Sequence, residues 1–381
     1  MLWNLTKINW QNVVNNSIYF LFYIPLLGTA VPSYIFILLH LFYYVFYKKS
    51  SKWGIMVGLM LFVFIIMKYS LLADGSQVGV LFRYFFGWIF VYLFLYYSKA
   101  RVDINKFIMV YTIEILLEAF LVNAILSPDY FFNYPDKTHH RTAFMGFYQR
   151  VYSVGVNASI SSTILALLYA YRDSCIKLGE KLGNKKIEIL VFFSFLAFAS
   201  GTGFCLYLIL LLYRYNLLRP KTFIVGVLLF ILLLILATTY AEQGSLLSRF
   251  SGIYMERLWE LKSMQIEEGL DWARQGSLFL GTDYKGVDLQ IYGDFALRDL
   301  FVSWGFVGLA ILLIFSFRRM NKCNRIPVLI GILGLFHYGG IFCFPGQLCF
   351  AYALMLNKKT LSYYMLKGKT EKVFDSNTSG S

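Results

Sequence analysis

Residues 188–213 read EILVFFSFLAFASGTGFCLYLILLLY, and they decide how the rest of the chain is interpreted. The stretch is almost wholly apolar, but basic residues stand on both sides of it, at 172–186 and 214–221. Basic loops of membrane proteins stay on the cytoplasmic side, so a segment with such a loop at each end has to leave that side and return to it. The run is too long for one ordinary span. We therefore predict two short half-spans that meet at the sequence SGTG, residues 200–203, where glycines break the run.

The composition places this hairpin in a membrane protein. Of 381 residues, 58% are hydrophobic, 19% aromatic and only 15% charged, and the mean hydropathy is +0.60. Apolar runs repeatedly reach the length needed to cross about 30 Å of hydrocarbon. The net charge of +14 lies in short loops between these runs, which serves topology and contact with anionic membrane lipid and gives no reason to expect nucleic acid as a partner. We predict an all-α polytopic membrane protein, a single integral domain over 1–381.

The alternation of basic loops and apolar runs predicts the topology. Two more runs, 18–47 and 326–356, are too long for one span, and a proline near the middle of the first and late in the second divides them into hairpins as well. This gives about twelve segments with both termini inside; if 18–47 is one tilted helix, the count is about eleven and the N-terminus lies outside. Single spans are predicted near 54–72, 79–98, 107–126, 151–171, 222–241 and 297–317.

Two outer loops are substantial, one near 127–150 and one near 242–295. Loops of this length in a compact protein are usually functional or disordered. In the second loop, apolar residues recur at helical spacing over 246–264, which predicts an amphipathic helix lying on the membrane or on the protein. Arg257 falls within its apolar stripe, where a charge either snorkels to the headgroups or binds an anion. Arg249 lies on the polar side beside two glutamates, and a surface ion pair explains it as well.

Arginine dominates the basic residues expected outside, whereas the inner loops carry mostly lysine. Orientation requires positive charge inside only, so topology gives no reason for outer arginines. Recognition of a phosphate or carboxylate does, because the guanidinium presents a planar fork of donors. The outer arginines are Arg83, Arg141, Arg150, Arg249, Arg257, Arg274 and Arg298.

Arg150 opens the span predicted at 151–171, and Ser153, Asn157 and Ser161 follow it at helical spacing. We expect these side chains to form a polar seam that descends from the outer arginine. Small and hydroxylic residues of this kind pack membrane helices together. The seam equally fits polar contacts with a lipid-linked substrate.

At the outer mouth of the span predicted at 297–317, Asp294 and Arg298 have the spacing of an ion pair on a helix. In the functional reading, Asp294 is a base or an orienting group, since a carboxylate at the bilayer edge can have a raised pKa. The glycine-bounded loop before it, 281–286, contains Tyr284 and can bring backbone N–H groups to an anion.

Two carboxylates, Glu114 and Glu118, lie one turn apart on one face of a predicted span. Carboxylates at this depth are costly and are expected to have a partner or a function. Arg83 and Lys68, on neighbouring spans, are the expected partners. The pattern fits a structural ion-pair network, or a proton path of the kind that transporters use.

Three stretches carry a family resemblance. From Gln149 the chain reads QRVYSVGVNASISSTILALL, an arginine, glycine and asparagine pattern that opens a span. From Ser248 it reads SRFSGIYMERLWEL, the arginine-bearing start of the large loop, and from Gly281 it reads GTDYKGVDLQIYGDFALRDLFVSWGFVGL, its end. Together with the order of short spans, these stretches resemble the O-antigen polymerase and ligase superfamily, the Wzy-type polymerases in particular.

Two positions depart from the family pattern. Family members often carry an arginine after the serine at the tip of the short hairpin, whereas Gly201 follows Ser200 here. One expected phosphate ligand is therefore missing or replaced. Ligases of the superfamily place a histidine near the position of Asp294, so its absence favours a polymerase.

The resemblance implies a metal-independent, GT-C-like glycosyltransferase of the bacterial inner membrane, without a cofactor, whose active site faces the periplasm. It would polymerise undecaprenyl-pyrophosphate-linked repeat units into O-antigen or a related surface polysaccharide. The growing glycan would move onto the incoming lipid-linked unit, so one class of molecule is both donor and acceptor. A chain-length regulator is a further expected partner.

In this reading, Arg150 and Arg257 bind the pyrophosphate, and Asp294 orients or deprotonates the acceptor. Further substrate contacts are expected from Arg298, Arg249, Asn157, Gly281 and Tyr284. One alternative is a ligase that joins the glycan to a lipid core. The other is a lipid-oligosaccharide flippase or transporter, which the buried carboxylates and broken spans would suit.

Overall fold

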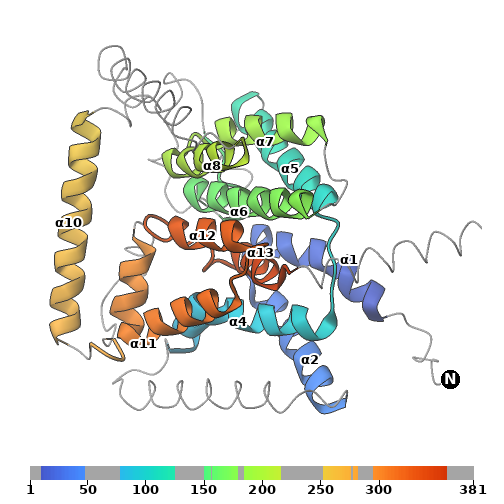
Figure 1. The fold of residues 1–381 in the computed structure, drawn as a ribbon, viewed down its shortest axis with the longest axis horizontal. Helices are drawn as coiled ribbons and strands as arrows, with labels where there is room; N and C mark the ends of the chain where they lie inside the picture. Colours follow the sequence, from blue (N-terminus) through green and yellow to red (C-terminus); the bar gives the residue numbers. More distant parts are fainter. Residues whose placement is uncertain are drawn as a thin grey trace, which may run out of the picture.

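A computed structural model describes residues 10–47, 78–124, 150–155, 157–178, 184–215, 252–275, 278–281 and 295–357 (Figure 1). Over these residues the regular elements are helices, which confirms the all-α prediction for this part of the chain. The spans predicted at 54–72 and 222–241, and the outer loop 127–150 apart from its last residue, lie outside the described residues.

The run at 188–213 forms a hairpin of two short helices, as predicted. These are α7 (Lys185–Phe198) and α8 (Gly201–Arg214). Ala199 adopts a left-handed conformation with a φ of 45° and ends α7. The Ser200 hydroxyl accepts a hydrogen bond from the Gly203 amide at 3.3 Å and caps α8. A helix stop and a helix cap at adjacent residues therefore make the break.

The first long run is also divided into two helices. It holds α1 (Trp10–Tyr23), the short 3₁₀ helix η2 (Ile24–Leu27) and α2 (Val31–Tyr47). The turn lies at Gly28, whose φ of 102° favours glycine, and Pro32 stands in the first turn of α2. The division of 18–47 into two helices is confirmed, and the single long helix is wrong. Whether each helix crosses a membrane stays a prediction.

The last long run forms α12 (Arg325–Gly334) and α13 (Phe344–Met355), as the proline at 345 indicated. A glycine-rich connection joins them, in which Gly346 and Gly340 approach so closely that a Cβ on Gly346 would lie 1.6 Å from the Gly340 carbonyl oxygen. α13 occupies the middle of the fold and packs against α4 and α6 (Figure 1).

Of the helices predicted as single spans, α4 and α5 begin and end near the predicted residues, and α6 begins later. α4 (Val78–Ser98) and α5 (Ile104–Ala124) match the predicted 79–98 and 107–126. α6 (Ala158–Lys177) begins well after the predicted start at 151. The residues before it form an irregular segment with the short 3₁₀ helix η6 (Ser153–Gly155), in which Ser153 has a φ of 52°. The predicted helical seam through Ser153 is therefore wrong.

α11 (Ala296–Arg319) covers the predicted 297–317 but is broken at Gly305, where φ is 59° and ψ is −157°. The break leaves the amides of Phe306 and Val307 without helical partners. The carbonyls of Leu278 and Phe279 accept from them at 2.9 and 3.1 Å. A short piece of the large loop thus completes the backbone hydrogen bonding of α11.

The helix predicted at 246–264 is found as α10 (Gly252–Gln275), which continues further than expected. It packs against α11 at the side of the fold and runs across the direction of α6, α8 and α12 (Figure 1). Large apolar side chains remain exposed on it, among them Trp259, Met264 and Ile266.

The basic segments predicted to be cytoplasmic meet at one end of the fold. Arg172, near the end of α6, is fully buried, donates to Asn105 at 2.9 Å and pairs with Glu188 at 2.6 Å. Arg214, at the end of α8, pairs with the same carboxylate at 2.7 Å. The starts of α5 and α7 are thus tied to the ends of α6 and α8.

The ends of α11 and α13 join the same cluster. Leu356, just past α13, packs against Cys175 near the end of α6. Its carbonyl accepts a hydrogen bond from Asn321, just past α11, at 3.0 Å. The start of α1 is tied to the link before α5, because Asn15 accepts from the Arg101 amide at 2.7 Å.

By length and composition, one helix of the described residues, α11, is long and apolar enough to cross a membrane. Four shorter apolar helices accompany it, which are α2, α8, α12 and α13. The largest fully buried side chains include Trp88, Trp304 and Arg172.

Candidate functional site

The irregular segment before α6 lies between α5 and the tip of the α7–α8 hairpin. The Val151 amide donates to the carbonyl of Ala197, next to the tip, at 3.2 Å. The next two amides, of Tyr152 and Ser153, both donate to the Glu118 carboxylate, at 3.0 and 3.1 Å. The segment is therefore held from both sides by its main chain.

Glu114 and Glu118 serve this segment together. Glu118 is buried and accepts the two amides, while Glu114 accepts from the Ser153 hydroxyl at 2.8 Å. Two acceptors satisfy the donors of a residue in left-handed conformation, which would otherwise be unstable for serine. The buried carboxylates therefore stabilise a backbone turn that the sequence did not reveal.

The structure does not test the ion pairs predicted for these carboxylates. The Arg83 guanidinium stands over the Tyr34 ring, 5.7 Å from its centroid. Lys68 lies outside the described residues. The ion-pair network of Glu114, Glu118, Arg83 and Lys68 stays a prediction.

Two helices begin side by side at this segment. The Asn157 carboxamide oxygen accepts from the Ser159 amide at 2.8 Å and caps α6. The Ser200 hydroxyl, which caps α8, donates to the Ser159 hydroxyl at 3.1 Å. The N-terminal ends of α6 and α8 therefore converge, and both carry partial positive charge. Asn157, predicted as a substrate ligand, uses its side-chain oxygen in the cap, and its contact with substrate stays a prediction.

Arg150 enters the same segment. Its guanidinium lies over the Tyr152 ring, 5.5 Å from the centroid, and its Nε is buried without a hydrogen-bond partner in the described part of the protein. A buried donor left unpaired costs free energy. An anion at this place would supply the missing acceptor.

The connection between α12 and α13 packs against the starts of α6 and α11. Cβ atoms on Gly334 and Gly340 would lie 2.5 and 2.8 Å from the Thr163 methyl group, so glycine lets this connection pack against the first turns of α6. Its carbonyls also cap α11, because His337 accepts from the Ala296 amide at 3.3 Å. The starts of α6 and α11 thus lie against the same connection.

Arg298 is engaged by acidic neighbours. It donates to Asp299 at 2.7 Å and lies 3.6 Å from Glu268 of α10, and its side chain is 10% exposed. Gly269 of α10 packs on its aliphatic part, since a Cβ there would lie 2.8 Å from Cγ of Arg298. This supports a structural role in joining α10 to α11.

Of the remaining predicted site residues, two lie in the described part of the chain and three do not. Gly281 is described, with a φ of 81°, and a Cβ on it would lie 2.4 Å from the Ser303 carbonyl, so it lets the loop reach α11. Arg257 lies in α10. Asp294, Arg249 and Tyr284 lie outside the described residues.

Sequence reasoning found Arg150 and the two glutamates but not what joins them. In this turn the left-handed residue is Ser153 and not the nearby Gly155, so the sequence does not indicate its conformation. The cap could have been found, because an asparagine before Ala-Ser-Ile is a typical helix start. Comparisons with protein-family models, with curated proteins and with solved structures find no match for this chain.

Proposed function

We propose that this chain is a polytopic protein of the bacterial inner membrane that polymerises lipid-pyrophosphate-linked oligosaccharide units on the outer side. Membrane placement is supported by the convergence of the basic segments at one end of the fold, around Arg172, Arg214 and Asn321. A soluble protein has no need to sort its basic loops this way, whereas a membrane protein does.

The sidedness has a second support. α10 packs against the part of α11 that contains Arg298, which is the end that carries Arg150 and the starts of α6 and α8. It also runs across the other helices (Figure 1). An amphipathic helix in this orientation fits the outer face of a membrane.

The observation that carries the transferase proposal is the Nε of Arg150, which is buried and has no hydrogen-bond partner among the described residues. It belongs to the segment that leads to the start of α6 and is held at Val151 by the tip of the α7–α8 hairpin. Arginine and helix N-termini are both suited to a pyrophosphate. The family resemblance supplies the reaction. A Cβ on Gly201, at the start of α8, would meet no atom of the described residues within 4 Å, so there is room at the position where the resembled family often carries an arginine.

In the proposed reaction, a sugar hydroxyl of the incoming unit attacks the anomeric carbon of the growing glycan. The new glycosidic bond forms as the bond to the pyrophosphate oxygen breaks, and that oxygen leaves with the electron pair. The hydroxyl proton goes to a base, for which Asp294 is the proposed group. Charge builds on the pyrophosphate, and preorganised cations in a water-poor site stabilise it. Arg150 has this role, with Arg257 as its proposed second ligand.

The test is to incubate the purified full chain with a synthetic polyprenyl-pyrophosphate repeat unit and to separate the products on a gel. The proposal expects a ladder of glycan lengths without added metal. One new product that requires a lipid-core acceptor would identify a ligase instead. Unchanged substrate, with movement of the lipid-linked unit across proteoliposome membranes, would identify a flippase, the reading that Glu114 and Glu118 suit.

A further inference from the structure

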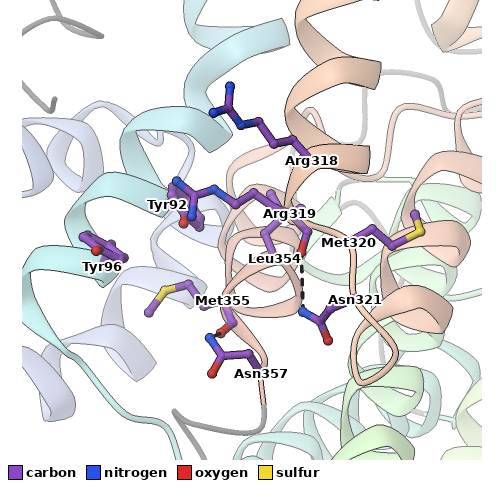
Figure 2. Close-up of a pocket in the computed structure, with 9 residues that line it drawn as sticks. All are labelled: Tyr92, Tyr96, Arg318, Arg319, Met320, Asn321, Leu354, Met355 and Asn357. Atoms are coloured by element: carbon purple, nitrogen blue, oxygen red, sulfur yellow. Dashed lines mark hydrogen bonds between the residues drawn. The ribbon is translucent and has the colours of Figure 1, made fainter.

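A pocket of about 320 Å³ lies at the end of the fold opposite the candidate site (Figure 2). The ends of three helices form it: α4 supplies Tyr92 and Tyr96, α13 supplies Leu354 and Met355, and the end of α11 supplies two adjacent arginines. α13 begins at the glycine connection beside the candidate site and ends at this pocket. Its twelve residues separate the two by about 18 Å of helix.

The pocket is cationic. Arg318 and Arg319 line it, and the other described residues that line it are uncharged. Arg319 extends toward Tyr92, with its guanidinium 5.3 Å from the ring centroid (Figure 2). This stacking fixes one charge at the wall, while the exposed Arg318 adds a second charge that can adjust.

Asparagine side chains cap the helix ends that form the pocket. Asn321 donates to the Leu356 carbonyl at 3.0 Å, and Asn324 donates to the Arg319 carbonyl at 3.1 Å. Asn324 also reaches the Leu354 carbonyl at 3.4 Å. These hydrogen bonds fix the ends of α11 and α13 relative to each other beside the pocket.

The pocket also has an apolar and aromatic side. Leu354, Met355 and Met320 contribute aliphatic surface, and Tyr92 and Tyr96 stack with centroids 6.1 Å apart. Tyrosine is favoured where hydrocarbon meets water. A ligand that matches this pocket has an anionic group beside an apolar part.

We propose that this pocket binds the phosphate of an anionic phospholipid in the inner leaflet, with the phosphate at Arg318 and Arg319 and the upper acyl chain against Leu354 and Met355. The inference rests on the membrane placement proposed above and not on the transferase chemistry. Basic pockets between helices on the cytoplasmic side are typical binding places for anionic headgroups. The volume lies at the lower end of ligand pockets and suits a headgroup with its glycerol.

Native mass spectrometry of the full chain in detergent tests this directly. The added probes are dioleoyl phosphatidylglycerol, dioleoyl phosphatidylcholine and, as a soluble phosphate, glycerol 3-phosphate. We expect the wild type to retain phosphatidylglycerol in preference to phosphatidylcholine. R318Q/R319Q should weaken phosphatidylglycerol binding about thirtyfold, since each basic residue near a membrane surface contributes about fivefold.

K322Q/R325Q is the matched control, because it removes two exposed charges from the neighbouring loop without touching the pocket lining. It should leave lipid binding within about twofold of the wild type. Equal losses in the two double variants would overturn the proposal, as would equal retention of the two lipids. Displacement of the lipid by millimolar glycerol 3-phosphate would show a soluble phosphate ligand instead.

Two further variants separate the possible causes of failure. If R318Q/R319Q does not remain monodisperse, R318Q alone replaces it, with an expected loss of about fivefold, because Arg318 is exposed. R150A should bind phosphatidylglycerol like the wild type. Loss of lipid binding in R150A would contradict the separation of the two sites, and absence of a glycan ladder would leave the lipid measurement unaffected.

Discussion

At the scale of single residues, Arg150 is the side chain on which the proposed activity depends most. Its Nε is buried and has no hydrogen-bond partner among the residues that the structure describes, so an anion there gains a charge-assisted hydrogen bond. We expect R150A to lower the rate of polymerisation by about 10²–10³-fold, measured as consumption of the lipid-linked donor. R150K should recover only part of it, because lysine lacks the planar fork.

The control for Arg150 is R274A. Arg274 lies on α10, is 74% exposed and pairs with Asp271 at 3.0 Å, an arrangement typical of a surface ion pair. R274A should keep the wild-type rate. If R150A retains more than about a tenth of the activity with normal folding, Arg150 does not stabilise the leaving group.

A glutamine could replace the hydrogen bonding of Glu114 but not that of Glu118. Both oxygens of Glu118 accept backbone amides, and a glutamine amide nitrogen would face one of these donors. We expect E118Q to lose about 1–3 kcal/mol of stability in detergent unfolding followed by tryptophan fluorescence. E114Q should lose less than about 1 kcal/mol, since its carbonyl still accepts from Ser153.

If Glu114 and Glu118 form a proton path, the expected effect is on transport and not on stability. E114Q could not carry a proton, so it would abolish transport of a lipid-linked unit while the protein stayed stable. Equal destabilisation by E114Q and E118Q would contradict the anchoring role. At this scale, the sequence indicated that the two carboxylates are important but not which donors they serve, because backbone amides leave no pattern in a sequence.

At the scale of elements, the three long apolar runs were predictable and the break in α11 was not. The runs carry proline and glycine where the chain turns, and their basic flanks require a return. Gly305 stands in an apolar helix where many membrane helices tolerate glycine. Its unusual conformation depends on residues 278–281, which are far from a helical pattern, so tertiary contact decides it.

The break makes a sharp prediction. In G305A the new methyl group would lie 2.5 Å from the Leu278 carbonyl oxygen, and alanine disfavours this backbone conformation. We expect a loss of about 2–4 kcal/mol of stability. The amides of Phe306 and Val307 should also exchange hydrogen faster, because their acceptors move away.

G201A is the matched control, since a Cβ at Gly201 meets no atom within 4 Å and the residue begins α8. It should change stability by no more than about 1 kcal/mol, in the stabilising direction. Similar losses in both variants would mean that glycine content, and not the contact with 278–281, decides the effect.

At the start of α6, contacts with other helices override the local helical pattern. Helical periodicity runs through 151–171, which is why the span was predicted from its first residue. The carboxylates of α5 and the Ala197 carbonyl bind the amides before Ala158 instead, and Asn157 caps what remains. Hydrogen-bond acceptors on other helices thus outweigh the helix propensity of residues 151–157. A single sequence does not show which acceptors lie nearby in the fold.

At the scale of the whole molecule, the ends of the described helices form two chemically distinct poles. One pole joins Arg172, Arg214 and Glu188 with the arginine pocket at the end of α11. The other joins Arg150 and the starts of α6 and α8, and α10 lies beside it. The basic loops of the sequence predicted that the helix ends around Arg172 and Arg214 would meet, because membrane proteins keep such loops on one side.

The sorting can be tested with membrane-impermeant maleimide on spheroplasts. In a background without the five native cysteines, M264C places a thiol on α10, where Met264 is 65% exposed, and K322C places one in the exposed link between α11 and α12. We expect M264C to react in intact spheroplasts and K322C only after the membrane is permeabilised. Reaction of both thiols before permeabilisation would place the two poles on one side and overturn the topology. A reversed pattern would keep the membrane placement but move the Arg150 site to the cytoplasm, where transfer from an outer lipid-linked donor cannot take place.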